Sequence, residues 1–276
     1  MRLLNVADLH IHTTASDGAY SLPKVARLAR LAGLEIIAVT DHDAVSSLDS
    51  VGTYGYLEII PGVELSAELG SREVHILGYY INSKDEKFRA VLSVLQGNRR
   101  ARLHAILERL ASHNVNIDPQ EVLDIAEGAS VGRLHVAELL IDKGHAASVY
   151  EAFRDFLGPE GKAFVPKTRF TVAAAIDLVH AAGGAAILAH PGSAFTHEEI
   201  KSFAAAGLDG LEAHYPRHTE PETTDAVRLA AELDLVVTGG SDFHGRRIID
   251  TEIGASRVSR AEVDKLHQRA VAHGAR

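Results

Sequence analysis

Two histidines stand two positions apart near the start of the chain, in ADLHIHTTASDG, residues 7 to 18, and an aspartate follows five positions after the second. If this stretch ends a β-strand, alternation places His10 and His12 on the same face, where a buried imidazole without a partner is costly. Imidazole nitrogens and carboxylate oxygens are also ligands of divalent metals. His10, His12 and Asp17 are therefore candidates for one end of a metal site, with a hydrogen-bonded pair of strand histidines as the alternative.

Further candidates stand at or near the ends of other predicted strands: Asp41, His42, Glu64, His75, His190, His214, Asp242 and His244. In a parallel barrel the loops that leave the strands converge at one edge, so these side chains would meet in space. Singly, several have an ordinary explanation, since TDHD at 40–43 and SDFHG at 241–245 also suit turns. Their joint occurrence favours metal binding. The histidines away from strand ends, among them His180 and His273, are expected to be mostly solvated.

The composition narrows the chemistry and the partners. The 276 residues contain 16 histidines and no cysteine, so a metal site must use His, Asp and Glu, which suits manganese, iron or zinc. A net charge of −9 argues against a broad surface for duplex nucleic acid but permits a positive pocket for one nucleotide or a single-stranded end. No stretch predicts a membrane span or a cleaved leader, so a cytoplasmic location without membrane association is expected, and the identity of any protein partner is left open.

The predicted elements place these residues on an α/β framework. Apolar strands at 3–10, 35–40, 56–63 and 74–80, with a helix at 23–32, predict a parallel βα arrangement. From about residue 85 to 158 the pattern changes to amphipathic helices without convincing strands, and alternating helices and strands then return. We therefore expect a barrel domain built from residues 1–84 and 159–276, and a helical insertion at 85–158 that caps the substrate.

Short segments in order along the chain resemble the motif series of the PHP (polymerase and histidinol phosphatase) family. They are DLHIHT (8–13), SDG (16–18), VTDHD (39–43), PGVELS (61–66), VHILGY (74–79), AHP (189–191) and GSDFHG (240–245). The helical region also resembles the insertion of stand-alone PHP phosphoesterases, in NRRARL (98–103), GRLHVA (132–137) and FVPK (164–167). The resemblance implies a distorted (β/α)7 barrel with two or three divalent metal ions, manganese being favoured over iron or zinc.

Matched residue by residue, the resemblance also implies how the ligands are grouped. His10, His12 and Asp242 would hold one metal, His75 and His190 a second, with Glu64 bridging the two, and Asp17, His42 and His244 would hold the third. Three divalent ions bring six positive charges, which only the three carboxylates of this set offset. The pocket would therefore attract a phosphate ester, polarise its oxygens and acidify a bridging water that acts as the nucleophile.

Other residues are candidates for contact with the substrate. Asp41 and His214 could supply a proton or charge relief to the leaving alkoxide. Basic residues beyond the metals could bind a second phosphate and so orient the substrate, and the candidates are Arg133, His135, Lys162, Lys167 and Arg169.

The predicted function is hydrolysis of a phosphate ester, in a small nucleotide such as a 3′,5′-nucleotide bisphosphate or at the 5′ end of a short single-stranded oligonucleotide. One alternative is a histidinol-phosphate phosphatase, although the insertion resembles that of the nucleotide-acting group. Two others are an amidohydrolase-type enzyme acting on a C–N bond and a catalytically silent metal-binding module. The completeness of the ligand set argues against the silent module.

Overall fold

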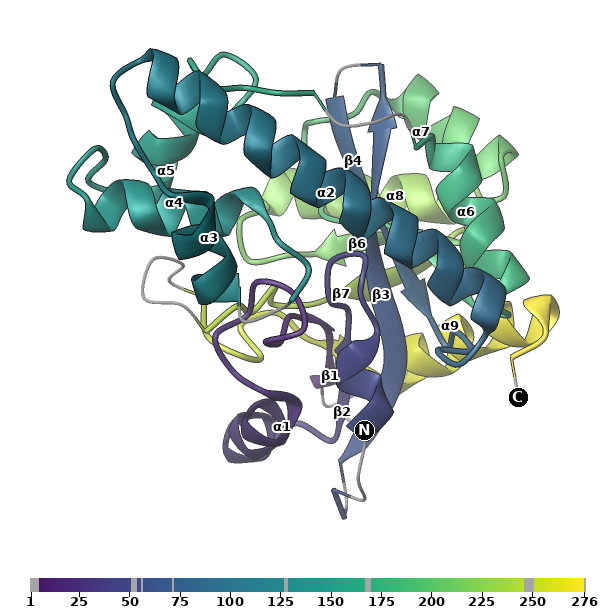
Figure 1. Cartoon of the computed structure of the whole chain (residues 1–276). Helices are drawn as coiled ribbons and strands as arrows, with labels where there is room; N and C mark the ends of the chain where they lie inside the picture. Colours follow the sequence, from purple (N-terminus) through teal and green to yellow (C-terminus); the bar gives the residue numbers. More distant parts are fainter. Residues whose placement is uncertain are drawn as a thin grey trace.

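The computed structural model describes residues 5–50, 54–55, 57–70, 72–126, 129–166, 170–245 and 251–275. Within these ranges, an eight-stranded sheet curls into a nearly closed barrel (Figure 1). Its strands are β1 (Asn5–Ile11), β2 (Ile36–Val39), β3 (Glu58–Leu69), β4 (Arg72–Tyr79), β5 (Ala185–Leu188), β6 (Gly210–His214), β7 (Val236–Gly239) and β8 (Val258–Ser259). Their order in space is β7-β6-β5-β4-β3-β2-β1-β8, and the predicted α/β barrel is confirmed.

The sheet is mixed, whereas the sequence indicated parallel strands. β4 runs antiparallel to both β3 and β5, and the short β8 runs antiparallel to β1. Because β4 is reversed, its beginning lies at the edge of the barrel where the parallel strands end. His75, near the start of β4, thereby pairs with Ser66 near the end of β3.

β3 is longer than predicted and changes its partner along its length. Its residues 58–61 pair with β2 and its residues 62–69 pair with β4. Glu64 therefore lies within the strand rather than at its end, which corrects the predicted boundary at residue 63. At Gly62, where the partner changes, an added Cβ would lie 2.9 Å from the Val39 carbonyl oxygen and 3.0 Å from that of Gly78. Only glycine permits so close an approach of three strands.

The barrel closes where the chain leaving β7 reaches the end of β1. The amide of His12 donates to the Phe243 carbonyl at 2.9 Å, and Ile11 and Phe243 form a parallel bridge. At Gly240 an added Cβ would lie 2.4 Å from the Cβ of His10. This contact brings residues more than 200 positions apart into one site.

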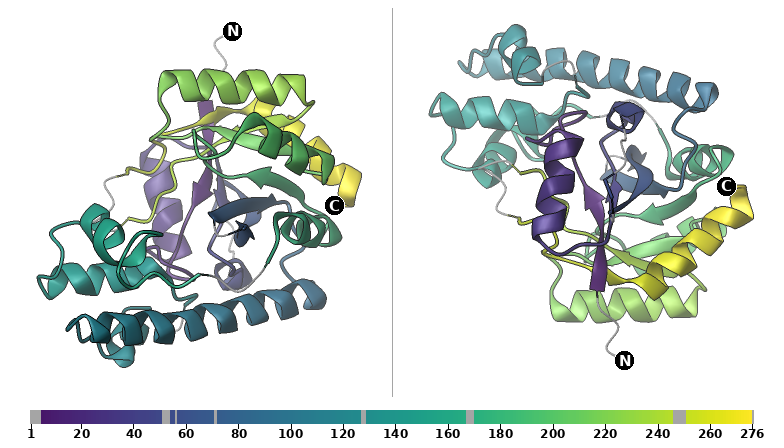
Figure 2. Two further views of the ribbon diagram at one scale, coloured as in Figure 1. Left: turned by 90° about the horizontal axis from the view of Figure 1, so that it is seen from above. Right: turned by 90° about the horizontal axis from the view of Figure 1, so that it is seen from below.

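Helices surround the barrel, as Figure 2 shows along two directions. They are α1 (Leu22–Leu31), α6 (Val172–Ala181), α7 (His197–Ala205), α8 (Glu220–Glu232) and α9 (Arg260–His273), and a 3₁₀ turn, η1, spans Ser46–Ser50. Alternate strand residues face different apolar clusters: Ile37 packs with the helical layer, whereas Ile36 packs with Leu9 and Ile187. Burial on both faces explains why the central strands are continuously apolar.

The predicted helical insertion is present and lies to one side of the barrel (Figure 1). It comprises α2 (Glu86–Ser112), α3 (Pro119–Ala126), α4 (Arg133–Asp142), α5 (Val149–Ala152) and a π-helical turn, η2, at Phe153–Leu157. The first half of α2 packs on the barrel through Phe88 and Leu92. Its second half joins α3, α4 and α5 in a separate apolar core that extends from Leu103 to Ala163. None of the helices in the described ranges has the length and apolar character required to cross a bilayer.

Candidate metal centre

The two histidines that first indicated a metal site lie at the end of β1. His10 and His12 are completely buried, and their rings lie 5.2 Å apart on the same side of the strand. The predicted strand-end histidines from the rest of the barrel meet them there. The ring of His42 lies 4.7 Å from that of His12, and the ring of His190 lies 5.8 Å from that of His10.

The carboxylate of Glu64 lies at the centre of this cluster. Its Oε2 is 3.3 Å from His10 Nε2 and 3.2 Å from His12 Nε2. The same oxygen is 3.1 Å from His42 Nδ1. The other oxygen, Oε1, is 2.8 Å from His75 Nδ1 and 3.3 Å from His190 Nε2. One carboxylate thus faces ligand atoms from five histidines, which is the placement expected of a bridging ligand.

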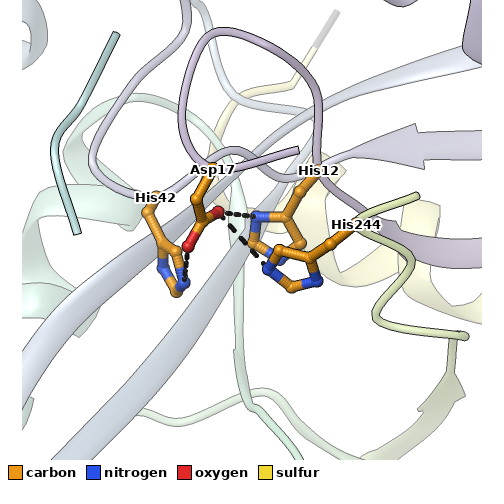
Figure 3. A group of neighbouring side chains, drawn as sticks. All are labelled: His12, Asp17, His42 and His244. Carbon is orange, nitrogen blue, oxygen red and sulfur yellow. Dashed lines mark ion pairs between the residues drawn. The ribbon is translucent and has the colours of Figure 1, made fainter. Parts of the chain in front are cut away.

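Two further carboxylates complete the cluster. Asp242 Oδ1 is 3.4 Å from His10 Nε2 and 3.2 Å from His12 Nε2. Asp17 lies on the side of His12 opposite to Glu64, and its Oδ1 is 3.3 Å from His244 Nε2 (Figure 3). Its Oδ2 is 3.8 Å from His42 Nε2. All the predicted ligands are therefore brought together.

The cluster has buried ligand atoms that make no hydrogen bond within the described part of the chain. They are His10 Nε2, His12 Nε2, His42 Nδ1, His75 Nδ1 and Glu64 Oε2. A buried polar atom that makes no hydrogen bond costs free energy even where an opposite charge lies near it, and the cost is large when several such atoms converge. Divalent cations among these nitrogens and oxygens would satisfy all of them, so the residues present fit a metal centre.

The carboxylates also control protonation in the absence of a cation. Burial by itself lowers the pKa of His12, but Asp242 and Glu64 outweigh it and raise that pKa to about 10. Burial likewise opposes charge on His75, whose pKa Glu64 and Glu73 raise to about 9. At His42, burial dominates and lowers the pKa to about 3. The metal-free centre therefore retains protons that cations must displace.

A loop after β1 presents Asp17, and Asp41 holds that loop. The Asp41 carboxylate accepts four hydrogen bonds of 2.7 Å, from the amide and hydroxyl of Thr13 and the hydroxyls of Ser16 and Ser47. Its oxygens are thus engaged beneath the loop, away from the cavity described below. This placement favours a loop-organising role over the predicted role as a proton donor.

A second layer of buried carboxylates was not predicted from the sequence. Glu212 of β6 contacts His10 Nδ1 at 3.0 Å and accepts a hydrogen bond from the amide of His190 at 2.8 Å. Asp8 of β1 accepts from the amide and hydroxyl of Ser241, at 2.9 and 2.6 Å. Each is a carboxylate within an apolar strand, and that pattern was the available signal. Glu212 orients two predicted ligands, and Asp8 orients the loop that carries Asp242.

Backbone conformation at two predicted ligands indicates a constrained site. His190 has a φ of 30° and Asp242 a φ of 54°, in the left-handed region that non-glycine residues seldom adopt. Such conformations persist where the surrounding contacts hold them, and they are enriched at functional sites.

A cavity of about 710 Å³ opens over the cluster. Asp17, Glu64 and Asp242 lie on its barrel side, whereas Leu134 of α4 and Tyr150 of α5 line the opposite side. The insertion therefore covers the candidate metal centre.

The predicted substrate contacts differ in how they are placed. Arg133 lines the cavity, where it forms an ion pair with Glu73. His135 is fully buried, and its Nδ1 accepts from the amide of Gly132 at 3.0 Å, which caps α4. Lys162 is exposed and does not line the cavity. Lys167 and Arg169 lie outside the described residues.

His214 is not among the described residues that line the cavity, whereas the next residue is. His214 Nε2 lies 3.9 Å from a carboxylate oxygen of Glu262 in α9. Tyr215 lines the cavity, and its hydroxyl donates to Asp242 Oδ2 at 3.0 Å. The structure therefore does not bring the predicted proton donor His214 to the site.

Two arginines of α2 line the cavity and were missed as site residues. Arg99 bonds to Asp43 Oδ2 and to the Ser66 hydroxyl, each at 2.5 Å. Arg102 donates to the Val165 carbonyl at 2.7 Å, and burial, with the charge of Arg133, lowers its pKa to about 10. Their spacing of three in NRRARL places both on one helix face, which was the signal in the sequence.

At the other end of the barrel, two histidines expected to be solvated share a carboxylate. Asp209, before β6, has one oxygen 2.8 Å from His180 Nε2 and the other 3.1 Å from His273 Nε2. Their rings stack at 3.6 Å. These contacts join α6 to α9 and correct the expectation for both histidines.

The comparison with known families agrees with the geometry of the site. The family model for the PHP domain matches residues 8–162. The chain belongs to the PHP domain family. The resemblance stated from the motifs is thus confirmed, and with it the prediction of an enzyme of the metal-dependent phosphoesterase class.

Relatives in this family are similar to the chain over most of its length. The chain is 32% identical to the 5′-3′ exoribonuclease Rnm of Salmonella typhimurium, covering 87% of this chain and 85% of that protein. It is 30% identical to a phosphoribosyl 1,2-cyclic phosphate 1,2-diphosphodiesterase of Eggerthella lenta, with 87% and 95% covered. It is 28% identical to a 3′,5′-nucleoside bisphosphate phosphatase of Chromobacterium violaceum, with 89% and 91% covered.

The fold is also that of a solved structure. A candidate metal-dependent phosphoesterase from Bifidobacterium adolescentis superposes with a TM-score of 0.88 at 27% identity, covering 95% of this chain and 96% of that one. The barrel and its insertion are therefore shared with that protein.

Proposed function

We propose that this PHP protein hydrolyses phosphate esters of nucleotides with two or three divalent cations, manganese in preference to iron or zinc. The observation that carries the proposal is the convergence of buried ligand atoms without hydrogen bonds around Glu64. We assign His10, His12 and Asp242 to one cation, His75 and His190 to a second with Glu64 between the two, and Asp17, His42 and His244 to a third.

Cations at these positions would polarise the phosphoryl oxygens and increase the acidity of water. In the overall reaction, water adds to phosphorus, the ester P–O bond breaks, and the alcohol leaves with a proton. Arg133 and the α2 arginines line the cavity and would bind phosphate oxygens that the cations do not hold. Tyr215, rather than His214, is the candidate to contact the phosphate beside Asp242.

We propose as substrates 3′,5′-nucleotide bisphosphates and the 5′ ends of short single-stranded RNA. The names of the relatives from Salmonella and Chromobacterium support these two classes. The cavity of about 710 Å³ has a size typical of small-molecule sites. A cytoplasmic location, where such substrates occur, belongs to the same proposal.

Release of inorganic phosphate from adenosine 3′,5′-bisphosphate by the manganese-loaded protein is the first test. A 5′-phosphorylated RNA oligonucleotide, whose shortening is followed on a gel, tests the second substrate class. We expect activity on at least one of them, its loss on chelation, and its loss in His10→Ala. His113→Ala, an exposed histidine remote from the cavity, is the matched control and should retain full activity.

The similarity to the Eggerthella diphosphodiesterase makes a five-membered cyclic phosphate the second candidate substrate. It is tested in the same assay, with a phosphatase added to release phosphate from the opened ring. Hydrolysis of the cyclic ester alone would reassign the substrate while keeping the metal centre. If protein with verified bound metal hydrolyses none of the three, the proposed function is wrong.

A further inference from the structure

One wall of the cavity is apolar and takes no part in binding a metal or a phosphate. It is formed entirely by the insertion, through Leu103, Ile106, Leu134, Val149, Tyr150 and Phe153. The arginines, Glu73 and the predicted metal ligands form the charged part of the same cavity. A ligand that fills the cavity must therefore carry an apolar or aromatic group next to its phosphate.

Tyr150 is the unusual member of this wall. Its side chain is 73% exposed although it lines the cavity. The other large apolar side chains of the wall are mostly covered, and Leu103 is only 3% exposed. The Arg154 guanidinium lies 5.8 Å from the centre of this ring, so the ring has one face toward a cation and the other for a flat ligand at the edge of the concave site.

The backbone under Tyr150 is firmly held. The Ser148 hydroxyl accepts from the amide of Glu151 at 3.2 Å, and the Glu151 carboxylate accepts from the amide of Ala147 at 2.8 Å. Both bonds lie at the start of α5, which continues directly into the π-helical turn η2. Phe153, at the start of that turn, also lines the cavity and has the Arg133 guanidinium 5.2 Å from its ring centre. The ring of Tyr150 is therefore exposed on a hydrogen-bonded turn close to Phe153 and Arg133, the arginine proposed above to bind phosphate.

We propose that Tyr150, with Phe153 behind it, is a stacking platform for the nucleobase of the substrate. This inference rests on the proposed function only for the substrate class, a nucleoside phosphate. Because the wall is apolar and offers few groups that could read base edges, the platform accepts all four bases with similar affinity. The base–aromatic contact would hold the nucleotide while its phosphate reaches the metal centre.

Equilibrium binding tests the platform without requiring turnover. Adenosine 5′-monophosphate and ribose 5-phosphate carry the same phosphate on the same sugar and differ by the base. We expect calorimetric titration of the chelated protein, which hydrolyses neither ligand, to give an affinity about 5- to 140-fold higher for the nucleotide, as base stacking predicts. Tyr150→Ala should remove this advantage and leave the affinity for ribose 5-phosphate unchanged, whereas Tyr150→Trp should preserve it.

Two controls separate the platform from general effects. Leu31→Ala changes a side chain that is 74% exposed on α1 outside the cavity, and it should leave both affinities unchanged. Guanosine, cytidine and uridine 5′-monophosphates should bind within a few-fold of the adenosine nucleotide.

The proposal is overturned if the nucleotide does not bind, if both ligands bind the wild type equally, or if Tyr150→Ala weakens both by the same factor. Strong discrimination among the bases would also contradict it. Phosphate release without a base-dependent affinity would refute the platform alone. A Tyr150-dependent affinity without hydrolysis of any ester would refute the catalytic assignment and keep the platform.

Discussion

At the scale of single residues, the centre depends on carboxylates that direct histidines. Glu64 contacts Nε2 of His10, the nitrogen that faces the cluster, and Glu212 contacts the other ring nitrogen, Nδ1. A contact of this kind holds the ring with Nε2 toward the site and makes that nitrogen a stronger ligand. The structure therefore assigns Glu212 a positioning role in any function of the centre.

Glu212→Gln should lower the affinity of the protein for manganese by about 10- to 100-fold, since glutamine keeps the shape of the side chain and loses its charge. Titration of the metal-free protein with Mn²⁺ measures this effect. Glu232→Gln, on an exposed part of α8, is the matched control and should bind manganese as the wild type does. Equal affinities in the two variants would show that Glu212 does not orient a ligand.

The raised pKa values of His12 and His75 predict how stability depends on pH. They lie at about 10 and about 9, above the ordinary value of 6.5, so protonation stabilises the metal-free fold. That contribution is complete below pH 6.5 and is lost as the pH rises through 9 and 10. The melting temperature of chelated protein should fall by at least about 2–4 °C between pH 6.5 and 9, which corresponds to about 1 kcal/mol.

Manganese should reverse this trend, because cations bind the neutral imidazole and compete with protons. Thermal melts of loaded and chelated protein over the same pH range make the comparison. Parallel pH profiles for the two forms would contradict the assignment of these histidines as ligands.

At the scale of elements, the site depends on the contact between β1 and the chain that leaves β7. That contact carries His10 and His12 from one side and Asp242 and His244 from the other. Gly240 lies where the two backbones are closest, and its missing side chain allows the approach. The geometry of the centre is therefore set by the closure of the barrel.

Gly240→Ala should separate the two segments, because its Cβ would lie 2.4 Å from that of His10. We expect a loss of about 1–3 kcal/mol in the free energy of unfolding together with weaker manganese binding. Denaturant titration and metal titration measure the two effects.

Gly97→Ala, in α2 with no heavy atom within 4 Å of its added Cβ, serves as the control. It should stabilise the protein by about 0.4–1 kcal/mol. Unchanged stability and metal affinity in Gly240→Ala would mean that the closure tolerates a wider spacing.

At the scale of the whole molecule, an acidic protein carries basic side chains inside a confined cavity. The net charge is −9, whereas Arg99, Arg102 and Arg133 gather beside the candidate metal centre. The surrounding negative charge disfavours binding of a long nucleic-acid duplex. The insertion covers the side of the cavity opposite the barrel and so limits access to the metal centre. A single-stranded end is the form of nucleic acid that this arrangement suits.

Binding of a 3′-labelled, 5′-phosphorylated single-stranded RNA should therefore depend only weakly on salt. With two or three phosphates held, the logarithm of the affinity should fall with a slope of about −1.4 to −2.1 against the logarithm of salt concentration. Fluorescence anisotropy on chelated protein, which prevents hydrolysis, measures the slope. A blunt duplex of the same length should bind at least about tenfold more weakly, and equal binding would reveal a duplex surface that the charge distribution does not predict.

The barrel class, the helical insertion and the candidate ligands could be predicted from the amino-acid sequence, because residue types and strand patterns are local properties. Which neighbouring residues face the cavity could not be predicted in this way. Packing between distant segments sets the reversed direction of β4, the length of β3 and the close approach of β1 to Gly240. For the same reason Tyr215 reaches the site in place of His214, and Asp41 is engaged below a loop. Side-chain direction is set by what packs against each element, and that information lies elsewhere in the chain.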